Sequence, residues 1–399
     1  MLHVTHLLGR IVSRLCDDEE FNAFDCDGSD WFLPARYIQP HLVGCGTFGQ
    51  VCSVLDSFTN DRVVIKKLYK AFDTGTHARR THRELILLHH MNHENVVGLL
   101  DAFTPDCCAQ SLTDIYLVTA YMSRTLHCVI GSEPNLSMDK INLLVYQILR
   151  GLKYIHSVGV IHRDLKPSNI VVDSEYRLKI IDFGLARVAS NSMMTGYVAT
   201  RWYRAPEVMF NWEKYGNSGK LDVWSVGCIM AQMLTGKPLF PGQNCLDQIR
   251  LIIDFLGTPS DHFLVTVEEA AREFLLSLPP AQKTNFINYF HRANTDALDL
   301  LDKMLQLNMR DRISASEALK HSYFSLRHDN QPEELLPAVR PFHDPLEEQS
   351  LSVEEFKFER NFEMEIKEPQ HSLLSGQPTN ARTGLYVALK GKQGTQLGS

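Results

Sequence analysis

The residues most able to do chemistry lie in the segment HRDLKPSN, at positions 162–169. It brings a carboxylate (Asp164), a cation (Lys166) and an amide (Asn169) together. A carboxylate can orient an attacking hydroxyl and accept its proton. An ammonium can neutralise charge on a transferring phosphoryl group, and an amide oxygen is a hard ligand suited to Mg²⁺. The segment therefore predicts phosphoryl transfer.

A second carboxylate follows shortly afterwards in LKIIDFGLA, where Asp182 ends a short apolar strand. A carboxylate in this position could hold a metal ion between phosphates. Any one of these residues could be purely structural. Their joint occurrence in this order favours a catalytic site.

Upstream, residues 44–49 read GCGTFG, which fits the pattern G-x-G-x-x-G. A dinucleotide-binding fold needs a helix directly after this pattern, whereas here a second strand-like segment follows. The pattern therefore favours a hairpin whose glycines let backbone N–H groups lie close over phosphates. A plain glycine-rich turn is the alternative.

Lys66 lies in VVIKK on the strand after this hairpin, and Glu84 lies in the helix-like stretch TGTHARRTHRELILLHHM. An ion pair between them would hold the ammonium towards a nucleotide phosphate. Side chains alternate along a strand, so Lys67 is predicted to lie on the opposite face.

Composition bounds the class of protein. The chain has 399 residues, a net charge of −7 and 44% apolar residues, and it has no basic block. Direct binding to nucleic acid or to an anionic membrane is therefore not expected. No stretch approaches the roughly 20 apolar residues of a membrane helix. The first residues carry arginines like a presequence, but the CDDEE that follows favours a short helix or a disordered extension.

The pattern along the chain predicts where elements lie. We expect an extension over 1–30, a strand-rich region over about 37–121 and a helical region over about 122–340. Residues 369–399 are rich in Gly, Gln, Ser and Thr, and are expected to be disordered.

These motifs together resemble the protein kinase family, and they occur in the family's order. The order is the glycine loop, Lys66, Glu84, HRDLKPSN, Asp182-Phe183-Gly184 and Ala205-Pro206-Glu207. The resemblance runs from about Trp31 to Glu368, and Lys166 is similar to the lysine of serine/threonine kinases. It implies an α+β, two-lobed fold with a small β-rich N-lobe and a larger helical C-lobe, using ATP and Mg²⁺.

The resemblance also assigns roles to single residues. Asp164, Lys166, Lys66 and Glu84 would be catalytic, and Asn169 and Asp182 would hold the metal. Asp222 resembles a brace of the catalytic loop, and Arg312 resembles the buried partner of Glu207. The nucleotide would contact Val43, Gly44, Gly46, Gly49, Val51, Lys66, Thr119 and Met122.

Two positions depart from the family's usual nucleotide pocket. Val64 stands where alanine is usual, and its extra methyl groups should narrow the roof over the adenine. Thr125 stands where relatives often carry a stronger polar partner for the ribose. We expect tuned ATP affinity and an active enzyme.

The segment MMTGYVATRWYRAPEV places Thr195 and Tyr197 in the position of an activation segment. T-x-Y resembles the mitogen-activated protein (MAP) kinases, and glycine in the middle resembles their stress-activated branch. Each phosphate would add about −1.5 to −2 charge. The resemblance implies that Arg80, Arg83 and Arg163 read phosphorylated Thr195. Arg201 and Arg204 would read phosphorylated Tyr197, and activity without phosphate should be low.

The family also implies partners. The expected partners are an upstream dual-specificity MAP kinase kinase, phosphatases, and protein substrates with Ser/Thr-Pro sites and basic docking motifs. The family implies that the protein works in the cytoplasm and nucleus. The docking patch would comprise Asp329, Glu333, Glu334 and Glu175, although a solvated acidic surface explains these residues equally well. Residues 341–368 resemble an extension that returns to the N-lobe. A scaffold that transfers no phosphate is the alternative function, and a dinucleotide-binding enzyme is a third.

Overall fold

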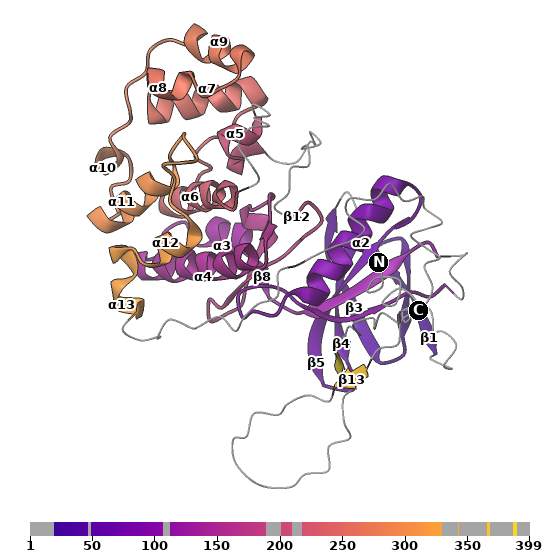
Figure 1. The fold of residues 1–399 in the computed structure, drawn as a ribbon. Helices are drawn as coiled ribbons and strands as arrows, with labels where there is room; N and C mark the ends of the chain where they lie inside the picture. Colours follow the sequence, from indigo (N-terminus) through magenta and orange to yellow (C-terminus); the bar gives the residue numbers. More distant parts are fainter. Residues whose placement is uncertain are drawn as a thin grey trace, which may run out of the picture. The chain divides into compact units, whose positions relative to one another are not determined.

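The computed structural model describes residues 20–46, 49–106, 112–188, 201–209, 218–328, Phe342 and two short strands at 365–367 and 386–388. The chain forms two compact units. Unit 1 comprises 1–82, 101–118 and 344–399, and unit 2 comprises 83–100 and 119–343. Strands dominate the described part of unit 1 and helices dominate unit 2 (Figure 1), so the predicted α+β, two-lobed fold is confirmed.

A five-stranded sheet in the order β3-β4-β5-β7-β6 carries the glycine-rich segment. Its strands are β3 (Tyr37–Gly46), β4 (Gly49–Asp56), β5 (Asp61–Leu68), β6 (Leu99–Phe103) and β7 (Ile115–Ala120). Strand β4 pairs antiparallel with both β3 and β5, so the three strands form two successive hairpins. Valine and isoleucine residues in β4 and β5 favour this extended backbone. The predicted hairpin after Gly44 is therefore confirmed.

A further hairpin, β1 (Phe21–Cys26) with β2 (Ser29–Pro34), precedes this sheet. Its tight turn uses Asp27 and Gly28, both with positive φ (55° and 77°). Trp31 and Leu33 are fully buried in one apolar cluster with Tyr37 and core residues of the sheet. The predicted extension over 1–30 therefore includes residues that the structure places in a packed hairpin. The sequence did not predict this hairpin, because only Trp31 and Leu33 show the alternation of a half-buried strand and that stretch is too short to recognise.

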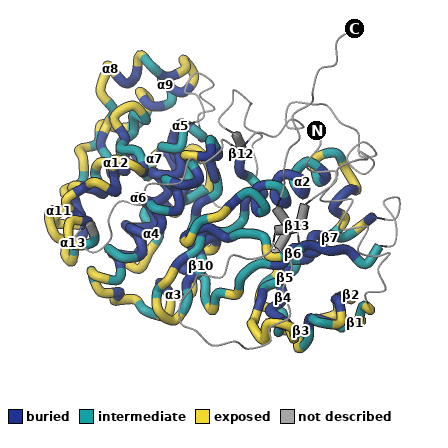
Figure 2. The backbone as a smooth tube through the Cα atoms, turned by 60° about the horizontal axis from the view of Figure 1, so that its bottom comes forward, coloured by how far each residue is buried: buried dark blue, intermediate teal, exposed yellow. Residues whose placement is uncertain are grey.

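Unit 2 is built around two long helices, α4 (Met138–Ser157) and α6 (Lys220–Thr235). Ser137 caps α4 by accepting a hydrogen bond from the backbone of Lys140. Every residue of α6 from Leu221 to Leu234 is buried, which Figure 2 shows as a dark helix inside the unit. α6 ends at Gly236, which adopts the left-handed conformation (φ 77°) that favours glycine.

Shorter helices surround these two. They are α3 (Leu126–Ser132), α5 (Pro206–Met209), α7 (Cys245–Leu256), α8 (Asp261–Leu264), α9 (Glu269–Ser277), α10 (Phe286–Tyr289), α11 (Thr295–Met304), α12 (Ala315–Leu319) and α13 (Ser325–His328), with 3₁₀ turns η2 (Pro167–Asn169), η3 (Arg201–Tyr203) and η4 (Ser322–Phe324). α2 (Gly75–His90) crosses the division between the units, which falls after His82. Among the described segments, none forms the long apolar helix that a bilayer span requires.

Short strands hold the ends of the HRDLKPSN segment. β9 (Val160–Ile161) pairs with β12 (Arg187–Val188), and β10 (Ile170–Val172) pairs with both β8 (Arg124–Thr125) and β11 (Leu178–Ile180). The segment therefore leaves one strand and enters another, while Asp182 lies two residues after the end of β11.

Near the C-terminus the structure describes little of the chain. The backbone N–H of Phe342 donates to Val158 O (2.8 Å), and its ring meets His90 edge-on. β13 (Glu365–Lys367) pairs antiparallel with β14 (Tyr386–Ala388), which lies inside the predicted tail 369–399. The rest of the predicted extension and tail lies outside the described residues.

Candidate active site

The carboxylate of Asp164 is held on one side only. Its Oδ2 accepts hydrogen bonds from Lys166 Nζ (2.7 Å) and Asn169 Nδ2 (2.9 Å). Asn169 Nδ2 also donates to the backbone oxygen of Asp164 (2.8 Å), which closes the loop upon itself. No described residue donates to Oδ1 of Asp164. That oxygen can therefore accept a hydrogen bond, and then a proton, from a substrate hydroxyl.

His162 ties this loop to the strand that leads to Asp182. Its side chain is fully buried, and Nε2 lies 3.0 Å from the carbonyl oxygen of Ile181. A carbonyl can only accept, so Nε2 carries the proton. The other nitrogen, Nδ1, then accepts from the backbone N–H of Asp164 (3.3 Å). One neutral imidazole thus fixes the positions of both acidic residues.

Asp222, on the buried helix α6, braces the backbone of the HRDLKPSN loop through hydrogen bonds. Its Oδ2 accepts from the backbone N–H of His162 (2.9 Å) and its Oδ1 from that of Arg163 (2.8 Å). Burial alone would raise the pKa of Asp222, but the hydrogen bond from His156 and the other donors hold that pKa below its usual value. The predicted bracing role is confirmed.

Two non-glycine residues of the site have left-handed backbones, Arg163 (φ 68°) and Asp182 (φ 67°). Such conformations typically cost about 1–3 kcal/mol each and persist where surrounding contacts impose them. Here Asp222 imposes the conformation at Arg163 through two successive N–H groups. The strain lies where the predicted catalytic and metal-binding residues meet.

Sequence reasoning missed His156 and Gly219. His156, at the end of α4, lies with Nε2 2.9 Å from Oδ2 of Asp222. A Cβ at Gly219 would lie 2.4 Å from the His156 ring, so only glycine fits beside it. No local motif marks these residues, because His156 is 66 positions from Asp222 and Gly219 is needed only where folding brings it against the His156 ring.

The two predicted metal ligands offer hard oxygen donors. Within the described residues, both hydrogen bonds of the Asn169 side chain use its nitrogen, so its carbonyl oxygen has no donor there. Asp182 supplies a carboxylate, whose Oδ1 accepts a long hydrogen bond from the backbone N–H of Gly184 (3.4 Å). An amide oxygen and a carboxylate are ligands that Mg²⁺ accepts, together with water and phosphate oxygens. The residues therefore fit the metal.

The segment that follows the predicted phosphorylation sites is anchored by a buried ion pair. Arg312 donates to both oxygens of Glu207 (2.6 and 3.0 Å), and its guanidinium lies over the Trp224 ring. This confirms the predicted pairing.

Burial lowers the pKa of the Arg204 guanidinium. The negative charge of Asp164 nearby raises this pKa, and the positive charge of Arg201 lowers it further.

In unit 1, the glycine hairpin depends on close backbone approach at Gly49. A Cβ there would lie 2.0 Å from the backbone oxygen of Lys67 on β5. Only glycine therefore lets β4 start so near to β5. Gly44 has open space around it, as a backbone that must receive a ligand requires.

The two neighbouring lysines of β5 lie on opposite faces, as predicted. Lys66 pairs in register with Val51 of the glycine hairpin. Lys67, on the other face, is buried; its Nζ donates to Asp30 O (2.7 Å) and pairs with Asp114 (3.2 Å). Lys67 thereby ties the N-terminal hairpin to the sheet. Glu84 is buried on α2, and its ion pair with Lys66 stays a prediction.

The other residues that are predicted to contact the nucleotide lie on strands or just after them. Val43 on β3 is exposed, Val51 is half-buried on β4, and Thr119 and Met122 lie at and after the end of β7. Thr125 caps α3, because its hydroxyl accepts from the backbone of Cys128 (3.2 Å). The Thr125 hydroxyl, which stands at the position of the ribose partner, therefore already takes part in a hydrogen bond within the protein.

Several predicted residues lie outside the described part of the chain: Thr195, Tyr197, Asp329, Glu333 and Glu334. Arg80 and Arg83 lie on α2, on either side of the division between the units. Glu175 lies in the turn between β10 and β11 and lines a pocket on unit 2.

The fold and this loop geometry define a protein kinase. A sequence model described as the protein kinase domain matches residues 37–324, and the chain belongs to that family. The match begins at the first strand of the five-stranded sheet and ends at η4.

Relatives narrow the class to the MAP kinases. The chain is 49% identical to mitogen-activated protein kinase 13 of Mus musculus, over 84% of this chain and 89% of that one. It is 50% identical to mitogen-activated protein kinase 14 of Xenopus laevis, over 82% and 89%. It is 45% identical to mitogen-activated protein kinase p38b of Drosophila melanogaster, over 94% and 98%. The protein is a serine/threonine kinase of the p38 type, and kinases of this family use ATP and Mg²⁺.

Proposed function

We propose that this protein is an ATP-dependent, proline-directed kinase of a stress-activated cascade, switched on by phosphorylation of Thr195 and Tyr197. The observation that carries the catalytic part is the one-sided fixation of Asp164. Lys166 and Asn169 occupy Oδ2, which leaves Oδ1 for the serine or threonine hydroxyl.

Residues of this chain supply the remaining steps. Asp164 orients the hydroxyl and takes its proton, while Lys166 neutralises charge on the phosphoryl group as it moves. Asn169 and Asp182 would hold Mg²⁺, which when bound would draw charge from the phosphates of ATP. The glycine hairpin covers those phosphates, and Lys66, oriented by Glu84, binds them.

Activation acts through arginines. Burial lowers the pKa of Arg204 most, and repulsion from the charge of Arg201 lowers it further. A phosphate on Tyr197 would relieve this repulsion, and a phosphate on Thr195 would pair with Arg163, Arg80 and Arg83. Without phosphates this part of the chain gains no such pairing, so activity should be low.

The partners follow from the same assignment. A dual-specificity MAP kinase kinase would add the phosphates and phosphatases would remove them, in the cytoplasm and nucleus. Substrates and regulators with basic docking motifs would bind Glu175, Asp329, Glu333 and Glu334.

The test is phosphate transfer to a Ser-Pro peptide before and after treatment with a dual-specificity activator kinase. Treated protein should be active, and Asp182→Asn should be inactive after the same treatment. The Thr195→Ala, Tyr197→Phe double variant should stay at the untreated rate. Equal rates for the double variant and the treated protein would refute the switch.

The same assay distinguishes an active kinase from a scaffold that transfers no phosphate. A scaffold would transfer no phosphate even when doubly phosphorylated, and Asp182→Asn would change nothing. The intact arrangement of Asp164, Lys166 and Asn169 supports the enzyme.

A further inference from the structure

The two arginines that are proposed to read phosphorylated Tyr197 are joined by the turn η3. Arg201 begins η3, and the backbone N–H of Arg204 donates to Arg201 O (2.9 Å), which closes one 3₁₀ turn. Side chains three residues apart in such a turn lie on the same side. The position of η3 therefore decides where both guanidinium groups stand.

Helix α6 holds η3 from one side, through Tyr203. The Tyr203 hydroxyl donates to Gln232 Oε1 (2.6 Å), and the Ser225 hydroxyl donates to Tyr203 O (2.7 Å). Tyr203, Gln232 and Ser225 are all buried. This side of η3 is therefore fixed to the core of unit 2.

Helix α7 holds η3 through a ring of three hydrogen bonds at Trp202. The indole Nε1–H of Trp202 donates to Gly242 O (3.1 Å), and the backbone N–H of Gly242 donates to Gln248 Oε1 (3.0 Å). Gln248 Nε2 then donates back to Trp202 O, at the longer distance of 3.5 Å. One glutamine amide thus links the side chain of Trp202 to its own backbone.

Packing alone does not account for a glutamine at position 248. Its side chain is 0% exposed, and the other buried residues of α7 are apolar: Ile249, Ile252, Ile253 and Phe255. A buried amide costs free energy unless it is hydrogen-bonded, whereas an apolar side chain would pack without that cost. A Cβ at Gly242 would lie 2.5 Å from Gln248 Cα, so the close approach that lets Gln248 reach Gly242 also requires glycine.

We propose that Gln248 is a positioning residue of the phosphate switch, which holds Arg201 and Arg204 through Trp202 where the phosphate of Tyr197 is read. The inference rests on the proposed function and deepens it, because it names what fixes the arginines of that switch. Gln248 acts through Trp202 and not on the substrate.

The test asks whether Tyr197 and Gln248 depend on each other. Wild-type protein and Tyr197→Phe are treated with a dual-specificity activator kinase, and mass spectrometry confirms full phosphorylation of each remaining site. The loss of kcat/KM caused by Tyr197→Phe is then measured with a short Ser-Pro peptide that lacks basic residues. In the Gln248→Met background this loss should be smaller by roughly threefold or more, because members of one network are energetically coupled.

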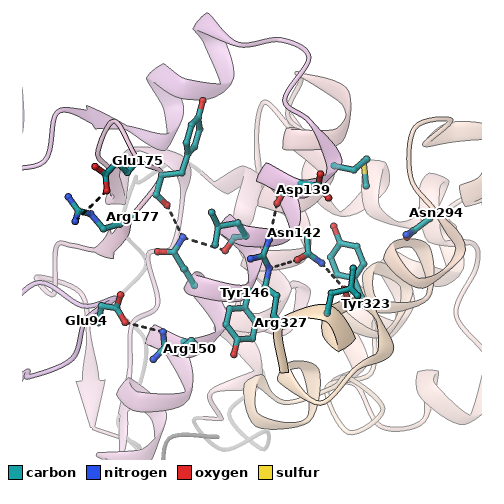
Figure 3. Close-up of a pocket in the computed structure, with 15 residues that line it drawn as sticks. Glu94, Asp139, Asn142, Tyr146, Arg150, Glu175, Arg177, Asn294, Tyr323 and Arg327 are labelled. Atoms are coloured by element: carbon teal, nitrogen blue, oxygen red, sulfur yellow. Dashed lines mark hydrogen bonds and ion pairs between the residues drawn. The ribbon is translucent and has the colours of Figure 1, made fainter. Parts of the chain in front are cut away.

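Gln147→Met is the matched control. Gln147 is also a buried glutamine that ties a helix to another segment: its Nε2 donates to Tyr176 O (2.8 Å), and its Oε1 accepts from Leu178 N (2.9 Å). It lines the pocket on α4 that Figure 3 shows, and neither Trp202 nor Gln248 lines that pocket. In the Gln147→Met background, the loss caused by Tyr197→Phe should equal that in wild type.

A second route to the same ring is Trp202→Phe, which keeps an aromatic ring and removes the N–H that donates to Gly242. It should shrink the loss caused by Tyr197→Phe in the same direction as Gln248→Met. Gly242 N–H also donates to Phe240 O (3.0 Å), so it keeps a partner in Gln248→Met. Thermal unfolding of each variant checks that the fold is intact.

An equal Tyr197→Phe loss in wild type, Gln248→Met and Trp202→Phe would overturn the positioning role. A loss that shrinks as much in Gln147→Met would overturn it too, because loosening any buried glutamine would then have the same effect. If Tyr197→Phe changes nothing in wild type, the phosphate switch itself fails and takes this role of Gln248 with it. That failure is recognised without any Gln248 variant, so the two are distinguishable.

Discussion

The segment after the predicted phosphorylation sites and the turn between β10 and β11 each hold an ion pair of similar length, yet these pairs differ in burial. Arg312 and Glu207 are 2.6 Å apart, and their side chains are 0% and 4% exposed. Arg177 and Asp173 are also 2.6 Å apart, but the Arg177 side chain is 68% exposed. Distance alone does not show what a charge pair does. Burial determines whether it fixes one geometry or exchanges partners.

The difference follows from solvation. A buried charge that loses its partner has no water to replace it, so removing one member is costly. An exposed charge regains water when its partner leaves, so the net contribution of the pair is small. The buried pairs therefore suit a site that must keep its shape, and the exposed pairs suit a surface where partners compete.

The largest effect should come from the catalytic carboxylate itself. Asp164→Asn should lower phosphate transfer by doubly phosphorylated protein about 10²–10⁴-fold, because the hydroxyl loses its proton acceptor. Steady-state transfer to a Ser-Pro peptide measures this. Asp173→Asn, in the exposed pair, should stay near the wild-type rate; comparable losses in both variants would break the comparison.

A large loss of stability should follow from breaking the buried pair. Arg312→Leu leaves Glu207 buried without its partner and should reduce the free energy of unfolding by about 3–5 kcal/mol. Urea unfolding of Arg312→Leu beside Arg177→Leu measures the contrast. If Arg312→Leu costs no more than Arg177→Leu, burial is not the deciding factor.

A smaller effect should appear in the pH dependence of stability. The pKa of Asp222 is lowered in the folded protein, so its contribution is present above the ordinary Asp pKa of about 3.9 and is lost as pH falls through the folded pKa. Asp222→Asn should therefore show a shallower loss of stability than wild type below about pH 5. Unfolding curves at several pH values measure the slopes. Parallel curves for wild type and variant would contradict the bracing role.

The smallest effect should come from the exposed pair. Arg177→Ala should change the free energy of unfolding by about 0.2–1 kcal/mol, and added salt should reduce that difference further. Urea unfolding at low and high salt tests this. A larger or salt-independent change would show that the turn carries more than an exchangeable pair, and would sharpen where the boundary between the two regions lies.

Much of this site could be predicted from the sequence because its residues are close together along the chain. Asp164, Lys166 and Asn169 lie in one short segment, and the structure joins them by direct hydrogen bonds. The two-lobed fold followed from the change of hydrophobic period near residue 122. The hairpin over Phe21–Pro34 was missed because a short two-stranded hairpin leaves only a weak pattern in the sequence.

The sequence by itself determined the chemistry: which carboxylates, amide and cations are present, and in what order. Only the tertiary structure decided that His156 and Gly219 support Asp222 and that Lys67 is buried beside Asp114. The physical reason is that side-chain types are local properties of the chain. Burial and pairing depend on residues that folding brings together from distant positions.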